Sequence, residues 1–71
     1  MGSYRVTAPI SVMVKENGTA YVLHTIPQGE IISVKEIPID LNRYVIVNWD
    51  GKDALMFARE LIIRAERTSV R

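Results

Sequence analysis

Two segments of the chain alternate hydrophobic and polar residues on both sides of a turn-forming dipeptide. One segment covers residues 9–27 and contains Asn17-Gly18; the other covers residues 43–57 and contains Asp50-Gly51. Asn-Gly and Asp-Gly are favoured in two-residue type I′ turns, because both central residues of that turn need a positive φ. Alternation with a period of two is typical of a half-buried strand. The pattern therefore predicts two β-hairpins.

The first hairpin has one nearly apolar face. A two-residue turn at Asn17-Gly18 pairs Glu16 with Thr19, Val14 with Tyr21, Val12 with Leu23 and Ile10 with Thr25. We assign this face to the core. The opposite face is mixed and carries Ser11, Met13, Lys15, Ala20, Val22 and His24.

The second hairpin is apolar on both faces. A turn at Asp50-Gly51 pairs Trp49 with Lys52, Val47 with Ala54 and Val45 with Met56 on one face. It pairs Tyr44 with Phe57, Ile46 with Leu55 and Asn48 with Asp53 on the other. If the first face is buried, Tyr44, Ile46, Leu55 and Phe57 form an exposed apolar patch, which usually marks an interface. The opposite assignment would move the patch to Val45, Val47, Trp49 and Met56.

Two further segments complete the predicted secondary structure. Pro27 and Gly29 suit a turn, and a strand containing Ile32 and Val34 follows it and ends by Pro38, with residues 39–43 as a loop. The last segment is ambiguous, because residues 53–67 could also form one amphipathic helix. The Asp-Gly turn favours a returning strand through Phe57, about one helical turn over Ala58–Leu61, and a short closing strand.

The order of these elements and two stretches of sequence resemble SH3-like barrels. "IPQGEIISV" resembles the turn-then-strand entry of bacterial SH3 domains, and "YVIVNWDGKDALMFAREL" resembles their strand, hairpin, strand and short helical turn. The whole chain is also similar to small uncharacterised bacterial proteins of this length. The resemblance implies an all-β fold: one small SH3-like barrel domain over residues 1–71, with five to six strands and one short helical turn near the C-terminus. We interpret Met1–Ser3 as partly a cloning remnant.

One enzymatic family of SH3-like chains, the type II dihydrofolate reductases, also bears on the interpretation. These assemble as tetramers around a pore lined by a Val-Gln-Ile-Tyr segment. Ala54-Leu55-Met56-Phe57 occupies that position here. Leu55 and Phe57 replace the amide and the phenol that hold folate and cofactor in that family, which argues against the activity.

Size and charge exclude several classes of function. The chain has 71 residues, no Cys and a net charge of +1. Disulfides, thiolate metal sites and a Cys nucleophile are therefore excluded, and the charge is too small to make nucleic acid an expected partner. No apolar run approaches a membrane span of about 20 residues, and the N-terminus lacks the plan of a signal peptide. We expect a cytoplasmic protein that binds no membrane.

Few side chains are candidates for chemistry. Trp49 and Tyr44 resemble the aromatic residues of SH3 peptide grooves, and Trp49 with Tyr4 forms a possible ligand groove. Trp49 could also simply cover the end of its hairpin over the Lys52 stem. His24 has no second ligand or nucleophile, and we place it opposite Ser11 on a partly exposed strand. Asp50, Asp53 and Glu60 are interpreted as turn, cross-strand and surface residues. We predict no catalytic, cofactor-binding or metal-binding residue.

Four arginines near the C-terminus, Arg59, Arg64, Arg67 and Arg71, alternate with Glu60 and Glu66. This alternation of charge favours an ion-paired segment exposed to solvent over a groove that binds nucleic acid. The sequence therefore predicts a non-enzymatic binding module without a cofactor, which self-associates as a twofold homodimer or binds another protein. A nucleic-acid-binding barrel and an oligomeric enzyme with a site at subunit contacts remain alternatives.

Overall fold

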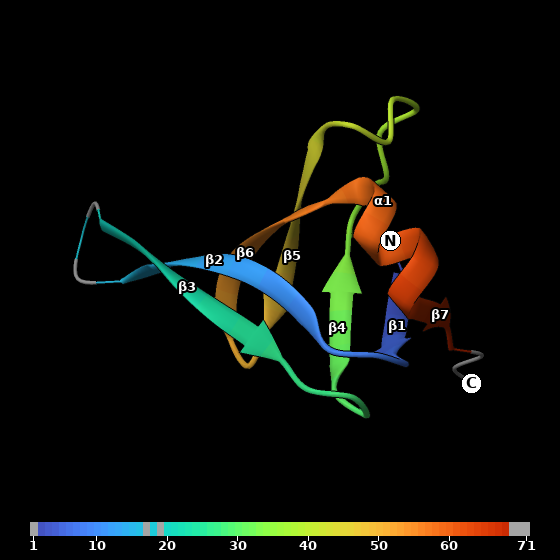
Figure 1. The fold of residues 1–71 in the computed structure, drawn as a ribbon, viewed down its shortest axis with the longest axis horizontal. Helices are drawn as coiled ribbons and strands as arrows, with labels where there is room; N and C mark the ends of the chain where they lie inside the picture. The colour runs from blue at the N-terminus through green and yellow to red at the C-terminus, as the bar shows by residue number, and fades with distance from the viewer. Residues whose placement is uncertain (1, 17, 19, 69–71) are drawn as a thin grey trace.

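A computed structural model shows one antiparallel sheet of seven strands with a single short helix near the C-terminus (Figure 1). The structure describes residues 2–16, 18 and 20–68. The elements in chain order are β1 (Gly2–Val6), β2 (Ile10–Glu16), β3 (Ala20–Ile26), β4 (Ile31–Val34), β5 (Tyr44–Trp49), β6 (Lys52–Phe57), α1 (Ala58–Arg64) and β7 (Ala65–Arg67). The strand order is β3-β2-β6-β5-β4-β1-β7. The sheet curls into a half-barrel, and the β2–β3 hairpin extends away from it.

This architecture confirms the predicted all-β fold class with one short helix near the C-terminus, and it is compatible with an SH3-like barrel. Strand β1 was not predicted from the sequence. This strand pairs with β4, where Tyr4 lies opposite Ile32, and with β7, where Tyr4 lies opposite Arg67. Gly2 and Ser3 are therefore strand residues within the sheet.

The core consists of alternate residues from six strands, closed by two residues of α1. Its buried members are Val6, Ile10, Val12, Val14, Ile26, Ile32, Val34, Val45, Val47, Ala54, Met56, Ala58 and Leu61. The helix is amphipathic: Ala58 and Leu61 are buried, whereas Ile62 and Ile63 are exposed. The predicted helical turn thus exists but continues to Arg64, giving seven residues or about two turns. No helix within the described ranges is long and apolar enough to cross a membrane.

The first hairpin differs from the predicted register by one residue. Glu16 pairs with Ala20, so the loop has three residues instead of two. Asn17, part of the predicted turn, and Thr19, the predicted partner of Glu16, lie outside the described residues. A slip of one residue moves every side chain of a strand to the opposite face.

The new register exchanges the two faces of β3. Tyr21 and Leu23, predicted to be in the core, are exposed, and Ile26 is buried opposite Ile10. The predicted register would have placed the polar Thr25 opposite Ile10. Burial of Ile26 instead of the polar Thr25 therefore favours the loop of three residues.

The second hairpin confirms the predicted pairing from Tyr44↔Phe57 to Trp49↔Lys52. Asp50 and Gly51 have φ values of 54° and 77°, as a type I′ turn requires. The structure also settles which face is buried: Val45, Val47, Ala54 and Met56 point into the core. Tyr44, Ile46, Leu55 and Phe57 therefore point outward.

Replacing Gly51 with alanine is expected to lower the free energy of unfolding by about 1–2 kcal/mol, because a residue with a Cβ is strained at this positive φ. A Cβ at this position would meet no atom within 4 Å, so the loss comes from the backbone conformation alone. Gly2→Ala is the matched control, since no positive φ is found there, and it should change stability by less than about 0.5 kcal/mol. Urea unfolding measures both variants; equal losses would contradict the argument.

Candidate protein-binding surface

A row of four apolar side chains crosses the outer side of the sheet. Met13 of β2 lies opposite Leu23 of β3 on one side and opposite Leu55 of β6 on the other. Leu55 in turn lies opposite Ile46 of β5. Directly opposite residues of antiparallel strands point to the same face, so Leu23, Met13, Leu55 and Ile46 form one continuous row, called here the central row.

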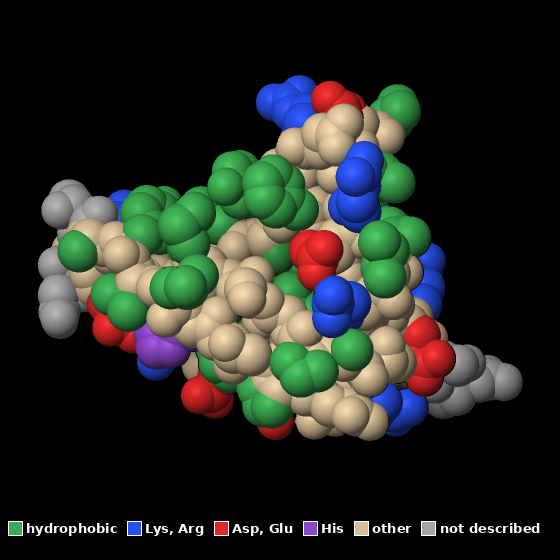
Figure 2. All heavy atoms as spheres, viewed as in Figure 1, with side chains coloured by type: hydrophobic (Ala, Val, Ile, Leu, Met, Phe, Trp, Pro, Cys, Tyr) green, Lys and Arg blue, Asp and Glu red, His purple; other side chains and the backbone are tan. Residues whose placement is uncertain are grey.

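The central row is open to solvent at both ends. Leu23 is 72% exposed and Ile46 is 60% exposed, while Met13 and Leu55 in the middle are half-buried. Figure 2 shows hydrophobic side chains gathered along the β2–β3 hairpin and in the angle between it and the loop that joins β4 to β5. The row therefore leaves apolar surface in contact with water on four neighbouring strands.

An aromatic pair extends this surface beside the central row. The rings of Tyr44 and Phe57 stack with centroids 4.5 Å apart and an interplanar angle of 18°. Both side chains are about half exposed. They lie two positions along β5 and β6 from Ile46 and Leu55, on the same face. Stacking holds the two rings in one orientation, so they offer a rigid apolar contact.

The opposite flank of the central row is polar. Lys15 lies opposite Tyr21, and Asp53 lies opposite Asn48. Lys15 and Asp53 are each two positions from Met13 and Leu55, toward the same end of the sheet. Both are exposed, and neither takes part in an ion pair among the described residues. We call the central row, the aromatic pair and this flank together the outer face.

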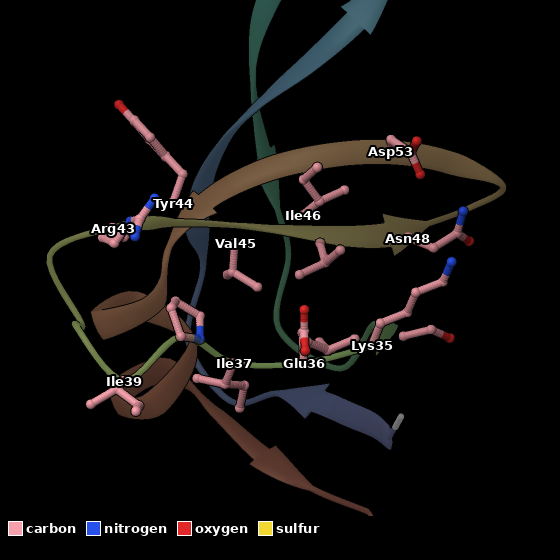
Figure 3. A pocket seen from close by; sticks show the side chains of 14 residues that line it. Lys35, Glu36, Ile37, Ile39, Arg43, Tyr44, Val45, Ile46, Asn48 and Asp53 are labelled. Carbon is pink, nitrogen blue, oxygen red and sulfur yellow. The ribbon is translucent and has the colours of Figure 1, made fainter.

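A hollow of about 820 Å³ borders the outer face at β5. It lies between β5 and the chain that follows β4, since β4 ends at Val34 and pairs with β5 only near Val47 and Asn48. Figure 3 shows Ile46 and Asn48 on one side of this hollow and Ile37 and Ile39 on the other. The outer face therefore has a depression next to its Ile46 end.

The two residues of the predicted ligand groove lie in different surroundings. Trp49 donates a hydrogen bond from Nε1 to Glu30 Oε1 at 3.0 Å, and its ring meets the edge of the His24 ring at 6.4 Å between centroids. Tyr4 lines a separate, smaller hollow of about 180 Å³ together with Arg67. The two aromatic side chains therefore do not form one platform, and Trp49 is held by the acidic side chain that precedes β4.

His24 lies opposite Val12, not opposite Ser11 as predicted, because of the register of the first hairpin. Its Nε2 is 2.9 Å from Glu16 Oε2. This contact joins the two strands near the end of the hairpin. No nucleophilic side chain hydrogen-bonds to this pair among the contacts of the described residues.

The carboxylates of the second hairpin and of α1 are dispersed. Asp53 lies opposite Asn48 as predicted, and Glu60 pairs with Arg64 at 2.7 Å. In the part of the chain that the structure describes, no group of three His, Asp or Glu side chains is placed to hold a metal ion.

The arginines of the C-terminal segment make contacts within the chain. Arg59 donates to Asn42 Oδ1 at 2.8 Å, Arg64 pairs with Glu60, and Arg5 of β1 lies 3.9 Å from Glu66. Arg71 lies outside the described residues. The positive charges of Arg5 and Arg64 are thus partly compensated by carboxylates, whereas Arg59 bonds to a neutral amide.

Sequence analysis found half of the central row and missed the rest. Ile46 and Leu55 were predicted as interface residues, whereas Leu23 was assigned to the core and Met13 to a mixed face. The sequence signal for the correct register was Ile26, the apolar residue that ends β3. Only a loop of three residues places Ile26 opposite Ile10, where it is buried.

No family model matches the sequence, and no curated protein or solved structure matches it at a significant level.

Proposed function

We propose that this protein is a non-enzymatic interaction module that binds a second copy of itself through the outer face. The observation that carries the proposal is the central row, which presents apolar side chains from four adjacent strands to solvent. Exposed apolar surface of this extent on a small domain is typical of an interface. In this proposal the domain works in the cytoplasm as an SH3-type barrel of the bacterial kind.

Burial of the apolar side chains of the outer face favours association. Each large apolar side chain that loses its remaining exposure contributes about 25 cal/mol per Å². Stable interfaces bury about 800 Å² on each partner. The outer face spans four strands of about 4.8 Å spacing, and a contact of that size would also bury the exposed residues around it. Part of the gain is offset by the entropy of association.

The pairing of Arg5 and Arg64 with carboxylates supports a protein partner over nucleic acid. Nucleic-acid binding depends on cations that are free to neutralise phosphates. The outer face itself combines Lys15 with Asp53, so it has no excess of positive charge.

Sedimentation equilibrium of the unmodified protein tests the proposal. We expect a concentration-dependent mass that approaches twice the 8.0 kDa of one chain at high micromolar concentration. A mass that stays at one chain in this range would contradict self-association. A titration with a generic oligonucleotide at low and moderate salt is the parallel control; tight binding that weakens steeply with salt would instead favour the nucleic-acid alternative.

A further inference from the structure

We infer that two copies pack outer face to outer face about a twofold axis parallel to the strands, so that β3 of each copy lies over β5 of the other. This inference rests on the proposed self-association and adds its geometry. Packed sheets lie about 10 Å apart with their strands aligned within about 30°. A twofold axis between two such sheets runs either along the strands or across them.

The two axes bring different residues into contact. An axis along the strands exchanges the ends of the central row. It places Leu23 on Ile46 of the partner subunit and Met13 on Leu55 of the partner subunit. An axis across the strands places each residue of the central row over the same residue of the partner subunit. It also places the polar flank of one copy over the aromatic pair of the other.

The charges of the polar flank favour the axis along the strands. This axis places Lys15 opposite Asp53 of the partner subunit, and the symmetry repeats the pair on the other side of the contact. An axis across the strands instead places Asp53 over Phe57 of the partner subunit, where the partner offers the carboxylate no opposite charge. Lys15 and Asp53 lie across from each other where the β2–β6 register continues, yet they make no ion pair among the described residues of one copy.

The same arrangement places apolar side chains at the hollow beside β5. The exposed Leu23 and Tyr21 of one copy lie over Ile46 and Asn48 of the partner subunit, and both of these positions line the hollow (Figure 3). The most exposed apolar side chain of the central row thus lies at a depression of the partner subunit. Shape and charge therefore favour the same axis.

Mixing two charge-reversed variants tests this arrangement. Lys15→Asp and Asp53→Lys, studied separately, should each dimerise about tenfold more weakly, because two attractive pairs become repulsive. A 1:1 mixture should recover the affinity of the unmodified protein, since each introduced charge then faces the opposite charge on the other chain. Rescue by mixing cannot arise from contacts within one chain. Sedimentation of the separate and mixed samples measures the effect.

Site-specific cross-linking checks the same geometry independently of charge. The chain contains no Cys, so Leu23→Cys and Ile46→Cys each introduce one thiol. A short bifunctional thiol reagent should join the two variants to each other in a mixture and neither variant to itself. Self-linking of each variant would support the axis across the strands and overturn the inference. A protein that remains monomeric overturns the proposed self-association itself, whereas a dimer without rescue by mixing overturns only the arrangement.

Discussion

Replacing Leu55 with glutamate is expected to convert the self-associated protein into a folded monomer. Leu55 lies in the middle of the central row, between Met13 and Ile46. In the proposed dimer, each copy would place one carboxylate at the centre of a dry contact. Unpaired charges and like charges at an interface cost several kcal/mol. The dissociation constant should therefore rise by at least about a thousandfold.

Ile63→Glu is the matched control for this variant. Ile63 is an exposed apolar residue of α1 and does not belong to the outer face. It receives the same change in charge, yet the dimer should persist. Sedimentation equilibrium measures the mass of both variants, and circular dichroism verifies that both keep the β fold. A Leu55→Glu protein that stays folded and dimeric would show that copies meet through a different surface.

Replacing Leu61 with alanine is expected to destabilise the protein strongly. Leu61 is fully buried, and it is the largest side chain through which α1 closes the core. Truncation of a buried leucine to alanine typically costs about 2–5 kcal/mol. A domain of this size has about 4–10 kcal/mol of stability in total. The variant should therefore lose a fifth or more of its free energy of unfolding.

Ile63→Ala is the control, because this residue of the same helix is 65% exposed. It should change the free energy of unfolding by less than about 0.5 kcal/mol. Urea unfolding in the Leu55→Glu background separates folding from association, which would otherwise add to the apparent stability. Similar losses for the two variants would mean that α1 does not close the core.

The comparison of the two hairpins shows which features local sequence can determine. Asp50-Gly51 specified its turn, its register and all six cross-strand pairs of β5 and β6. Asn17-Gly18 has the same turn chemistry, but the loop of β2 and β3 is one residue longer. The extra residue follows from the burial of Ile26 opposite Ile10, a contact that forms only when both strands lie against the rest of the core.

The N-terminal strand and the length of the helix depended on distant contacts in the same way. β1 has few apolar residues, and its partners β4 and β7 lie far away in the sequence. Residues 58–64 carry a helical pattern, and Leu61 anchors it to the core while Ile62 and Ile63 remain exposed. A short helix is stabilised mainly by tertiary packing, so its end could not be read from propensity.

The sequence by itself determined the all-β class, the second hairpin and a short helical segment followed by a closing strand. These features depend on interactions between residues close in the chain: turn dipeptides, strand alternation and helix spacing. Only the tertiary structure decided which face of the second hairpin is buried and which residues of β3 join it on the outside. Both faces are apolar, so their hydrophobicity alone is ambiguous. The choice was made by the packing of Val45 and Met56 against residues of β2, β4 and α1 in the core, and this packing left Leu23, Met13, Leu55 and Ile46 together in one exposed row.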